Sequence, residues 1–244
     1  MELKICHLYP DVLNQSGDAG NVSCFVKRLE QRGITAHVSK LPIGEQRSLR
    51  GFDLVFIGGG QQLGQTEMLE DLRRGREKDI RAAVEEGVVF LAIGGGLEML
   101  GRYTEDLEGK RTDFAGAVDM YTVENAQRLT GDYLFNCEEL PGVTVVAFSN
   151  HSGRTYLGKN LRPLGTVIKG QGNNGEDGTE GLRYKNVFGS YGHGPLLPKN
   201  PELCDLILKT ALERKYGSVS LSPLDDSMES MARETIYQRL GGGK

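Results

Sequence analysis

Two apolar runs that each end in three glycines limit most strongly what this chain can fold into. They are "FDLVFIGGG", residues 52–60, and "VVFLAIGGG", residues 88–96. An unbroken apolar run bounded by glycines is typical of a strand buried on both faces of a parallel sheet. The segment "EKDIRAAVEEG" between them places Ile80, Ala83 and Val84 on one helical face. A strand, a helix and a second strand in this order predict a βαβ unit.

The same alternation starts at the beginning of the chain. "LKICHLY" and "ITAHVSKL" have the composition of strands, and an apolar helical face lies between them, with Asp18 or Asn21 placed to cap the helix. The second half is different, because "MYTVENAQRLTGDYLF", "VTVVAFSNHSGRTY", "GTVIKG" and "LRYKNVFGSYGHG" are rich in β-branched and aromatic residues. We therefore expect an α/β fold with a mainly parallel central sheet and some antiparallel strands in the second half. Residues 200–217 and 225–240 predict two final helices.

Composition excludes several classes of protein. The net charge is −4 and charges of both signs alternate along the chain, so nucleic acid is not an expected partner. No apolar run approaches the roughly 20 residues that span a bilayer, and the first residues lack a secretory signal. We expect a cytoplasmic protein without membrane insertion. The four cysteines have no C-x-x-C spacing, so their sequence pattern indicates neither a metal site nor a redox pair; they are Cys6, Cys24, Cys137 and Cys204.

The residues that could carry chemistry follow the strands. Because parallel strands end at one sheet edge, the glycine turns 58–60 and 94–96 are expected to lie together and could bind an anion or oxyanion through backbone N–H groups. This signal is weak alone, since neither turn fits a phosphate-binding motif. His193 follows an apolar strand between two glycines. Alone it is more simply a structural histidine, but beside the glycine turns it is a candidate general base.

Several short motifs, taken in order, resemble one enzyme family. "FIGGG", "LAIGGGLEMLG", "AQRLTGDY", "FSNHSGRTY", "GQGNN" and "YKNVFGSYGHGPLLPKNP" resemble the class I glutamine amidotransferase domains of the cobyric acid synthase (CobB/CobQ) type. They are most similar to the GatD branch, the glutaminase subunits of lipid II isoglutaminyl synthase. The resemblance runs from "SGDAGN" near the start to about Gly217. We expect residues 1–217 to form the amidotransferase-like domain, and residues 218–244 to be a C-terminal helix and tail of the same domain.

The resemblance implies a flavodoxin-like three-layer fold and a glutaminase that passes ammonia to a Mur-ligase-like partner, MurT. That partner would hold ATP and Mg, leaving no cofactor in this chain, and would amidate the D-glutamate of lipid II during peptidoglycan synthesis. Within the site, His193 matches the family histidine and Arg128 the arginine that holds glutamine. Gly60 and Gly95 fall at substrate-binding turns. The position of the nucleophilic cysteine is Gly94.

Three departures from the family pattern affect the predicted chemistry. Gly94 has no side chain to form a thioester, Glu98 stands where the family has Gln, and Pro195 stands where many members have the third catalytic residue. The partner would then supply the acid. A nucleophile elbow strains a non-glycine residue by about 1–3 kcal/mol, so glycine should preserve the fold while removing covalent chemistry.

Alternatives remain open at this point. The chain could be a non-catalytic scaffold or regulatory subunit, or an amidotransferase domain that serves cobyrinate or another acid. Simpler structural interpretations also apply to four further residues. We expect His151 and Arg154 to stabilise a tight turn, and Lys199 and Arg214 to be solvated charges. The final helix is expected to pack on its own domain.

Overall fold

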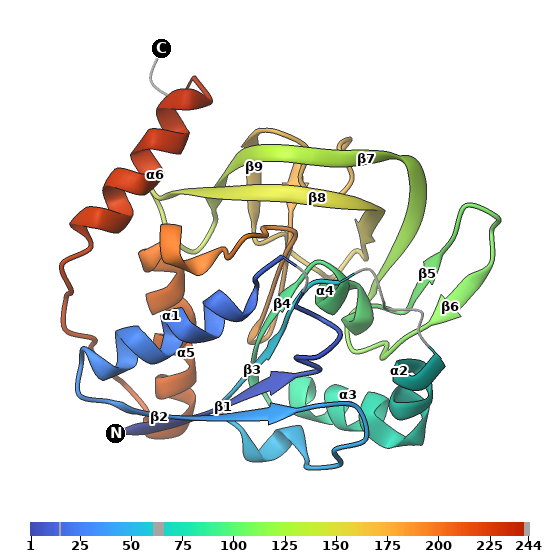
Figure 1. Ribbon diagram of the computed structural model, residues 1–244, viewed down its shortest axis with the longest axis horizontal. Helices are drawn as coiled ribbons and strands as arrows, with labels where there is room; N and C mark the ends of the chain where they lie inside the picture. The colour runs from blue at the N-terminus through green and yellow to red at the C-terminus, as the bar shows by residue number, and fades with distance from the viewer. Residues whose placement is uncertain (15, 61–65, 242–244) are drawn as a thin grey trace.

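The parallel sheet predicted from the apolar runs is present. The computed structural model describes residues 1–14, 16–60 and 66–241, and its first sheet has the strand order β11-β12-β4-β3-β1-β2 (Figure 1). All neighbours pair in parallel except β11, which is antiparallel to β12. The strands are β1 (Glu2–Leu8), β2 (Thr35–Leu41), β3 (Leu54–Ile57), β4 (Val89–Ile93), β11 (Leu182–Tyr184) and β12 (Val187–Ser190).

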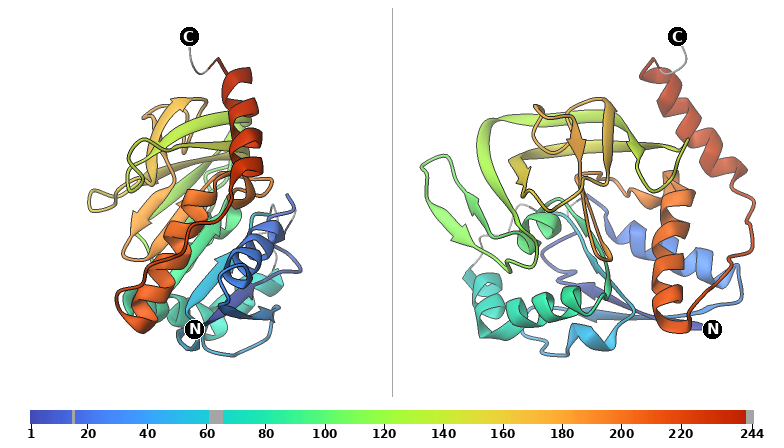
Figure 2. Two further views of the ribbon diagram at one scale, coloured as in Figure 1. Left: turned by 90° about the vertical axis from the view of Figure 1, so that its left-hand side faces the viewer. Right: turned by 180° about the vertical axis from the view of Figure 1, so that it is seen from behind.

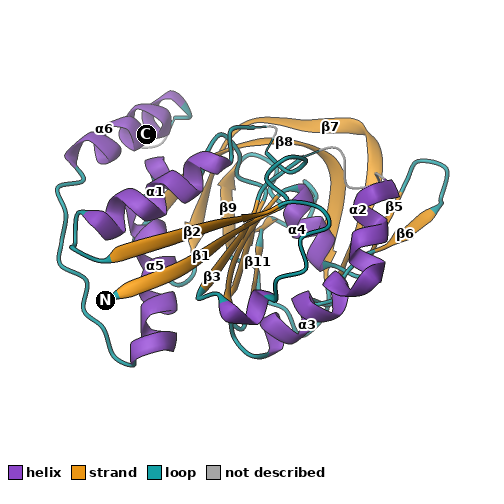
Figure 3. Cartoon of the chain, turned by 60° about the horizontal axis from the view of Figure 1, so that its bottom comes forward, coloured by secondary structure: helices purple, strands orange, loops and turns teal. Residues whose placement is uncertain are grey.

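Both faces of this sheet are buried, which explains why its central strands are apolar without interruption. In β4, Leu91 points into one apolar cluster and Phe90 into the other. The first cluster includes side chains of α1 (Ala19–Glu30) and α5 (Pro201–Tyr216). The second includes side chains of α2 (Thr66–Asp71), the π-helical η2 (Leu72–Arg76), α3 (Glu77–Glu85) and α4 (Gly95–Leu100). Figure 3 shows these two layers of helices on either side of the strands.

Most of the strands expected in the second half form a second, mainly antiparallel sheet, in which only β5 and β7 pair in parallel among the described strands. Its order is β10-β9-β7-β5-β6, and β8 pairs with the other side of β7. Inward-facing Phe135 and Val145 join the apolar cluster beneath α5, so this sheet packs onto the first unit. The three-layer α/β fold is therefore confirmed, with a second sheet added to it. The strands are β5 (Tyr103–Glu105), β6 (Arg111–Asp113), β7 (Met120–Cys137), β8 (Thr144–Leu157), β9 (Gly165–Lys169) and β10 (Thr179–Glu180).

Two local predictions were wrong. Asp18 does not cap α1 through its side chain; instead the Asn14 side chain accepts a hydrogen bond from the Ala19 amide at 2.8 Å. Asn21 lies inside α1 and accepts from the Leu197 amide at 2.9 Å. The "NHSGRTY" segment is not a turn but the second half of β8, paired with β7. Long-range pairing supplies the hydrogen bonds that a local bend was expected to supply.

The short helices η1 (Leu49–Gly51) and η3 (Leu197–Lys199) complete the described elements together with α6 (Ser227–Arg239). Figure 2 shows α6 at the outside of the molecule. As expected, α6 lies against its own domain, next to η3 and β8, but none of its residues is buried. Ion pairs hold it instead: Arg233 binds Glu202 of α5 with both terminal nitrogens at 2.5 and 2.8 Å, and Arg239 pairs with Asp132.

Because charge pairs rather than burial hold α6, we expect Arg233→Ala to loosen this helix without unfolding the rest. Partly exposed ion pairs contribute about 1 kcal/mol or less, and regions with little buried surface open independently. Chymotrypsin should cleave the variant within α6 several-fold faster than the native chain, while Tm changes by no more than about 3 °C.

Arg50→Ala is the matched control, because Arg50 forms an exposed ion pair with Glu86 far from α6. It should leave cleavage within α6 unchanged. A loss of stability in Arg233→Ala comparable to that of a core substitution would show that α6 is part of the cooperative core.

Candidate functional site

All five residues predicted for the site line one cavity. Gly60, Gly94, Gly95, Arg128 and His193 surround a volume of about 440 Å³ at the carboxyl ends of β3 and β4. The first sheet contributes the glycine turns and the histidine, and the second sheet contributes the arginine. Ligands generally bind at this edge of a parallel sheet. Here the second sheet closes the edge on one side.

Gly94 has the backbone of a nucleophile elbow. It joins β4 to α4 with φ +50° and ψ −116°, a conformation that residues with a side chain rarely adopt. Its amide donates to the Ser190 carbonyl at 2.9 Å, and the Gly96 amide donates to the Gly58 carbonyl at 3.1 Å. The turn is thus held by the neighbouring strand and by the other glycine turn. The end of β4 therefore presents a strained turn without a side chain to the cavity.

The His193 ring occupies the space above both glycine turns. A Cβ atom built on Gly94 would lie 2.7 Å from His193 Cε1 and 2.8 Å from its Nε2. A Cβ atom on Gly59 would lie 2.4 Å from the same Cε1. The His193 amide donates to the Phe148 carbonyl at 2.8 Å, which joins this loop to β8. The imidazole is therefore in the position of a base beside the elbow, and it can approach this closely because residue 94 is glycine.

Asp18 is a site residue that the sequence analysis assigned to another purpose. Its Oδ2 accepts from the Gly59 amide at 2.8 Å and lies 3.3 Å from His193 Nδ1. The side chain is fully buried, and its Oδ1 has no hydrogen-bond partner within the described ranges. Such a carboxylate fixes the orientation and tautomer of an imidazole. This carboxylate comes from the loop after β1, whereas the sequence analysis looked for it at the position of Pro195. The motif "SGDAGN" after the first predicted strand was the sequence signal that could have identified Asp18.

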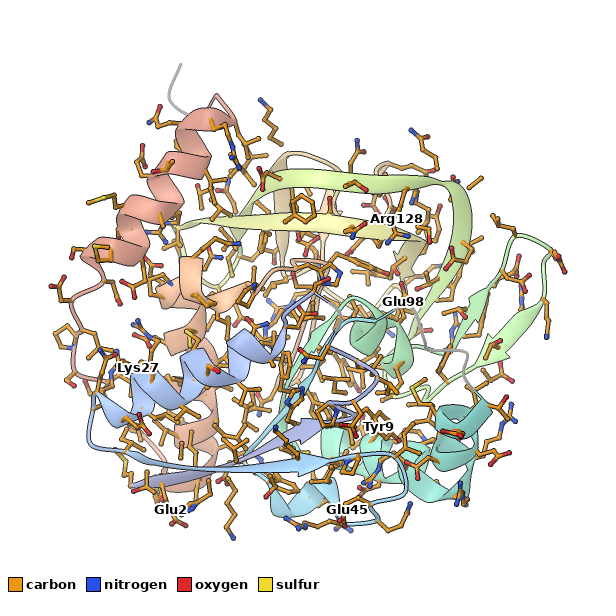
Figure 4. The ribbon with its side chains drawn as sticks, viewed as in Figure 1. Glu2, Tyr9, Lys27, Glu45, Glu98 and Arg128 are labelled. Carbon is orange, nitrogen blue, oxygen red and sulfur yellow. The ribbon has the colours of Figure 1, made fainter. Side chains whose placement is uncertain are left out.

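Arg128 reaches the cavity from an irregular part of β7. The pairing of β7 with β8 shifts register between Glu124 and Leu129, and this irregularity contains Arg128. Its guanidinium donates to the Asn150 side chain and to the Asn150 carbonyl, both at 2.8 Å. Figure 4 shows Arg128 on the second sheet above Glu98 of α4. A guanidinium held in one plane at a cavity wall is suited to binding a carboxylate.

Glu98 introduces an acidic group into the cavity wall. Its Oε1 accepts from the Tyr191 hydroxyl at 2.8 Å, and burial raises the pKa of its carboxyl to about 7. The Tyr191 ring stacks on His151 with 3.8 Å between centroids, and burial lowers the pKa of that imidazole to about 4. His151 also lines the cavity. It was expected to be a structural turn residue, but β8 carries it to the site.

The cavity has no group that can act as a covalent nucleophile of the family type. All four cysteines are free thiols, and none of them lines the cavity. Within residues 1–14, 16–60 and 66–241, no three His, Cys, Asp or Glu side chains are grouped in a way that could hold a metal ion. In the same ranges no helix is long and apolar enough to cross a bilayer.

Comparisons with known proteins agree on a family. Residues 4–201 match the CobB/CobQ-like glutamine amidotransferase domain. The chain is 37% identical over 235 residues to subunit GatD of lipid II isoglutaminyl synthase (glutamine-hydrolyzing) from Streptococcus pneumoniae, covering 96% of this chain and 90% of that protein. Identity to the Staphylococcus aureus GatD is 36% over 238 residues, or 98% and 96% of the two chains. A cobyric acid synthase from Pelotomaculum thermopropionicum is 29% identical, but only 36% of its length is matched.

Solved structures show the same fold at lower sequence identity. PurLQS from Thermotoga maritima superposes with a TM-score of 0.55 at 18% identity, over 88% of this chain and 97% of that one. A glutamine amidotransferase from the same organism gives a TM-score of 0.55 at 16% identity, with 98% of each chain covered. These similarities establish the arrangement of elements, and the site itself rests on the residues described above.

The raised pKa of Glu98 predicts a pH-dependent stability gain in Glu98→Gln. An unfolded Glu98 has the ordinary pKa of 4.5, whereas the folded value is about 7, so the folded chain binds the extra proton between these values. Its contribution to stability is greatest below about pH 4.5 and is lost as the pH rises through about 7. The Gln variant avoids this loss. Urea unfolding should show a gain of about 1–3 kcal/mol at pH 8, and a gain at least twofold smaller at pH 5.

Glu108→Gln, in an exposed loop, is the matched control and should give the same small change at both pH values. If Glu98→Gln changed stability equally at pH 5 and pH 8, the carboxyl would not be held protonated by burial.

Proposed function

Because the chain belongs to the CobB/CobQ-like glutamine amidotransferase domain family, we propose that it is a GatD-type subunit of a lipid II isoglutaminyl synthase that has lost glutamine hydrolysis. One observation carries the loss of activity: Gly94 has the elbow backbone, and the His193 ring lies where a cysteine side chain would begin. Identity over nearly the full length of both GatD relatives supports the subunit assignment.

The chemistry of the family explains why this substitution is decisive. Hydrolysis through a thioester requires a thiolate to attack the carboxamide carbon, and a histidine to accept the thiol proton and then return it to the departing ammonia. His193 and Asp18 retain the base and its orienting carboxylate. Without an Sγ atom at residue 94 the base has no proton to accept. Water attack would lack the effective concentration that a fixed nucleophile provides.

The rest of the site is suited to binding. Arg128 provides a cation for a ligand carboxylate, and Gly60 and Gly95 are the proposed amide contacts for the carboxamide oxygen. Glu98 adds a second ionisable group, which in its charged form attracts the ammonium of an amino acid. We therefore propose that glutamine or glutamate still binds to the cavity, without turnover by this chain.

The proposed partner is a Mur-ligase-like protein, MurT, in a heterodimer. That subunit would hold ATP and Mg, activate the D-glutamate carboxyl of lipid II and transfer ammonia to it, in the cytoplasm. The "subunit" designation of the GatD relatives supports a partner for this chain. In the complex this chain would contribute no cofactor, and ammonia from solution would replace ammonia from glutamine.

A second candidate function is a regulatory pseudo-subunit that senses glutamine or glutamate. The intact cavity, with Arg128 and Glu98 in place but no nucleophile, favours this alternative. It differs from the first proposal in one measurable respect. A scaffold leaves the ammonia-dependent activity of the partner insensitive to glutamine, whereas a sensor changes that activity when glutamine is added.

Restoring the nucleophile is expected to restore hydrolysis. Gly94→Cys, purified with the Mur-ligase-like partner, should release glutamate from glutamine at least 100-fold faster than the native chain, because the base and the elbow are already in place. The elbow strain should lower stability by about 1–3 kcal/mol. Glutamate release and urea unfolding measure the two effects.

Gly94→Ala is the control for the strain, because it introduces a Cβ atom without a thiol and should be destabilised similarly but remain inactive. His193→Ala in the Cys background should abolish the restored activity. Glutamate release by the native chain at a rate near that of the Cys variant would show that another residue carries the reaction.

Arg128 is expected to provide most of the binding energy for the ligand carboxylate. Arg128→Ala should weaken glutamine or glutamate binding by roughly 10- to 100-fold in isothermal titration calorimetry, since hydrogen bonds to charged groups contribute about 1.5–3 kcal/mol. Arg102→Ala is the matched control, because Arg102 pairs with Asp119 on an exposed surface and does not line the cavity. Unchanged affinity in the Arg128 variant would exclude the proposed binding mode.

A further inference from the structure

Two of the four thiols lie in contact although their sequence positions gave no sign of it. Cys24 Sγ of α1 is 3.7 Å from Cys204 Sγ of α5. The two helices pack on the same face of the parallel sheet (Figures 1 and 3). Cys204 belongs to the apolar cluster on that face, and the partly buried Cys24 packs against it. The sequence separation of 180 residues explains why a spacing motif could not reveal the pair.

Salt bridges beside the thiols hold the helices in this register. Arg28, one turn after Cys24, donates to both carboxylate oxygens of Asp205 at 2.7 and 2.8 Å. Asp205 directly follows Cys204. Arg32 adds contacts of 3.0 and 2.6 Å to the same carboxylate. Two guanidinium groups on α1 thus bind the same carboxylate on α5. This arrangement prevents one helix from sliding along the other.

The two sulfur atoms differ in access to solvent. Cys24 is partly exposed, whereas Cys204 is fully buried, and burial raises the pKa of its thiol well above the ordinary value. An oxidant in solution therefore reaches Cys24 first. The remaining cysteines, Cys6 and Cys137, are buried, and within the described residues neither makes a hydrogen bond to another sulfur atom.

We propose that Cys24 and Cys204 form a reversible intramolecular disulfide that joins α1 to α5 when a peroxide is present. The Cys24 thiolate attacks the peroxide, whose O–O bond breaks, giving a sulfenic acid and hydroxide. The Cys204 thiol then attacks the Cys24 sulfur and displaces water, with its proton going to the leaving oxygen. Overall two thiols are oxidised to one disulfide and one hydrogen peroxide is reduced to two waters. A small thiol reverses the bond by attacking the more exposed Cys24 sulfur.

The cross-link would restrain the part of the molecule that supports the site. The loop preceding α1 carries Asp18, which contacts His193. The start of α5 is held to β8 by Asn200, whose side chain accepts from the Val146 amide at 3.0 Å and donates to the Val146 carbonyl at 2.8 Å. A bond between the two helices therefore connects the first-sheet side of the site to the second sheet. This modification does not depend on the proposed loss of glutaminase activity.

The test uses the full chain, reduced and then exposed to hydrogen peroxide. Intact mass should fall by two hydrogen atoms, free thiols counted after denaturation should fall from four to two, and a peptide pair containing Cys24 and Cys204 should appear. Tm should rise by roughly 5–10 °C on oxidation and return after reduction.

Cys24→Ala should lose the mass change and the rise in Tm, while Cys137→Ala, the matched control, should retain both. Because Cys24 is only partly buried, its replacement should leave the fold intact, which far-UV circular dichroism verifies. Three results would overturn the proposal. Cys24 could be oxidised only to a sulfenic or sulfonic acid, the disulfide could form between two chains, or all four thiols of the native chain could remain reduced.

Discussion

The close contact between the two glycine turns sets the geometry on which the site depends. The Gly96 amide donates to the Gly58 carbonyl, and a Cβ atom on Gly96 would lie 2.7 Å from both that oxygen and the Ile57 side chain. The two turns can approach this closely only because Gly96 carries no side chain. β3 and β4 are buried on both faces, so their ends cannot separate without exposing apolar surface. The His193 ring then fits against Gly59 and Gly94 as one surface.

Two carboxylates with different partners lie at this edge of the sheet. Asp18 accepts a hydrogen bond from the Gly59 amide and lies against the His193 ring. Glu98 has a hydroxyl partner and buried surroundings, which favour the neutral acid. One fold thus provides an acid that orients the base and another that titrates near neutral pH. The arrangement would charge the cavity wall as pH rises, even though the covalent nucleophile is missing.

The structural features that depend on local sequence pattern were predicted correctly. Continuous apolar runs indicated the doubly buried strands, and the rule that parallel strands end at one edge correctly brought Gly60, Gly94, Gly95 and His193 together. The separate antiparallel sheet was missed because pairing partners are chosen by long-range packing that no short window contains. For the same reason Asp18 was interpreted as a helix cap and His151 as a turn residue. The Cys24 contact with Cys204 depends on helix packing across 180 residues, which spacing rules do not address.

On the proposal that Gly94 replaces a cysteine, the position of the histidine indicates how little structural change would restore an active site. Nε2 lies on the side of Gly94 and Nδ1 on the side of Asp18, so a side chain at residue 94 would push the ring towards the carboxylate. The present Nδ1 to Oδ2 distance of 3.3 Å exceeds that of a strong charge-assisted hydrogen bond, about 2.8 Å, which leaves room for such a shift. Movement that relieves the overlap would therefore also strengthen the contact that orients the base. On the proposal that Gly94 replaces a cysteine, the elements that position the elbow, the base and its carboxylate are all still present.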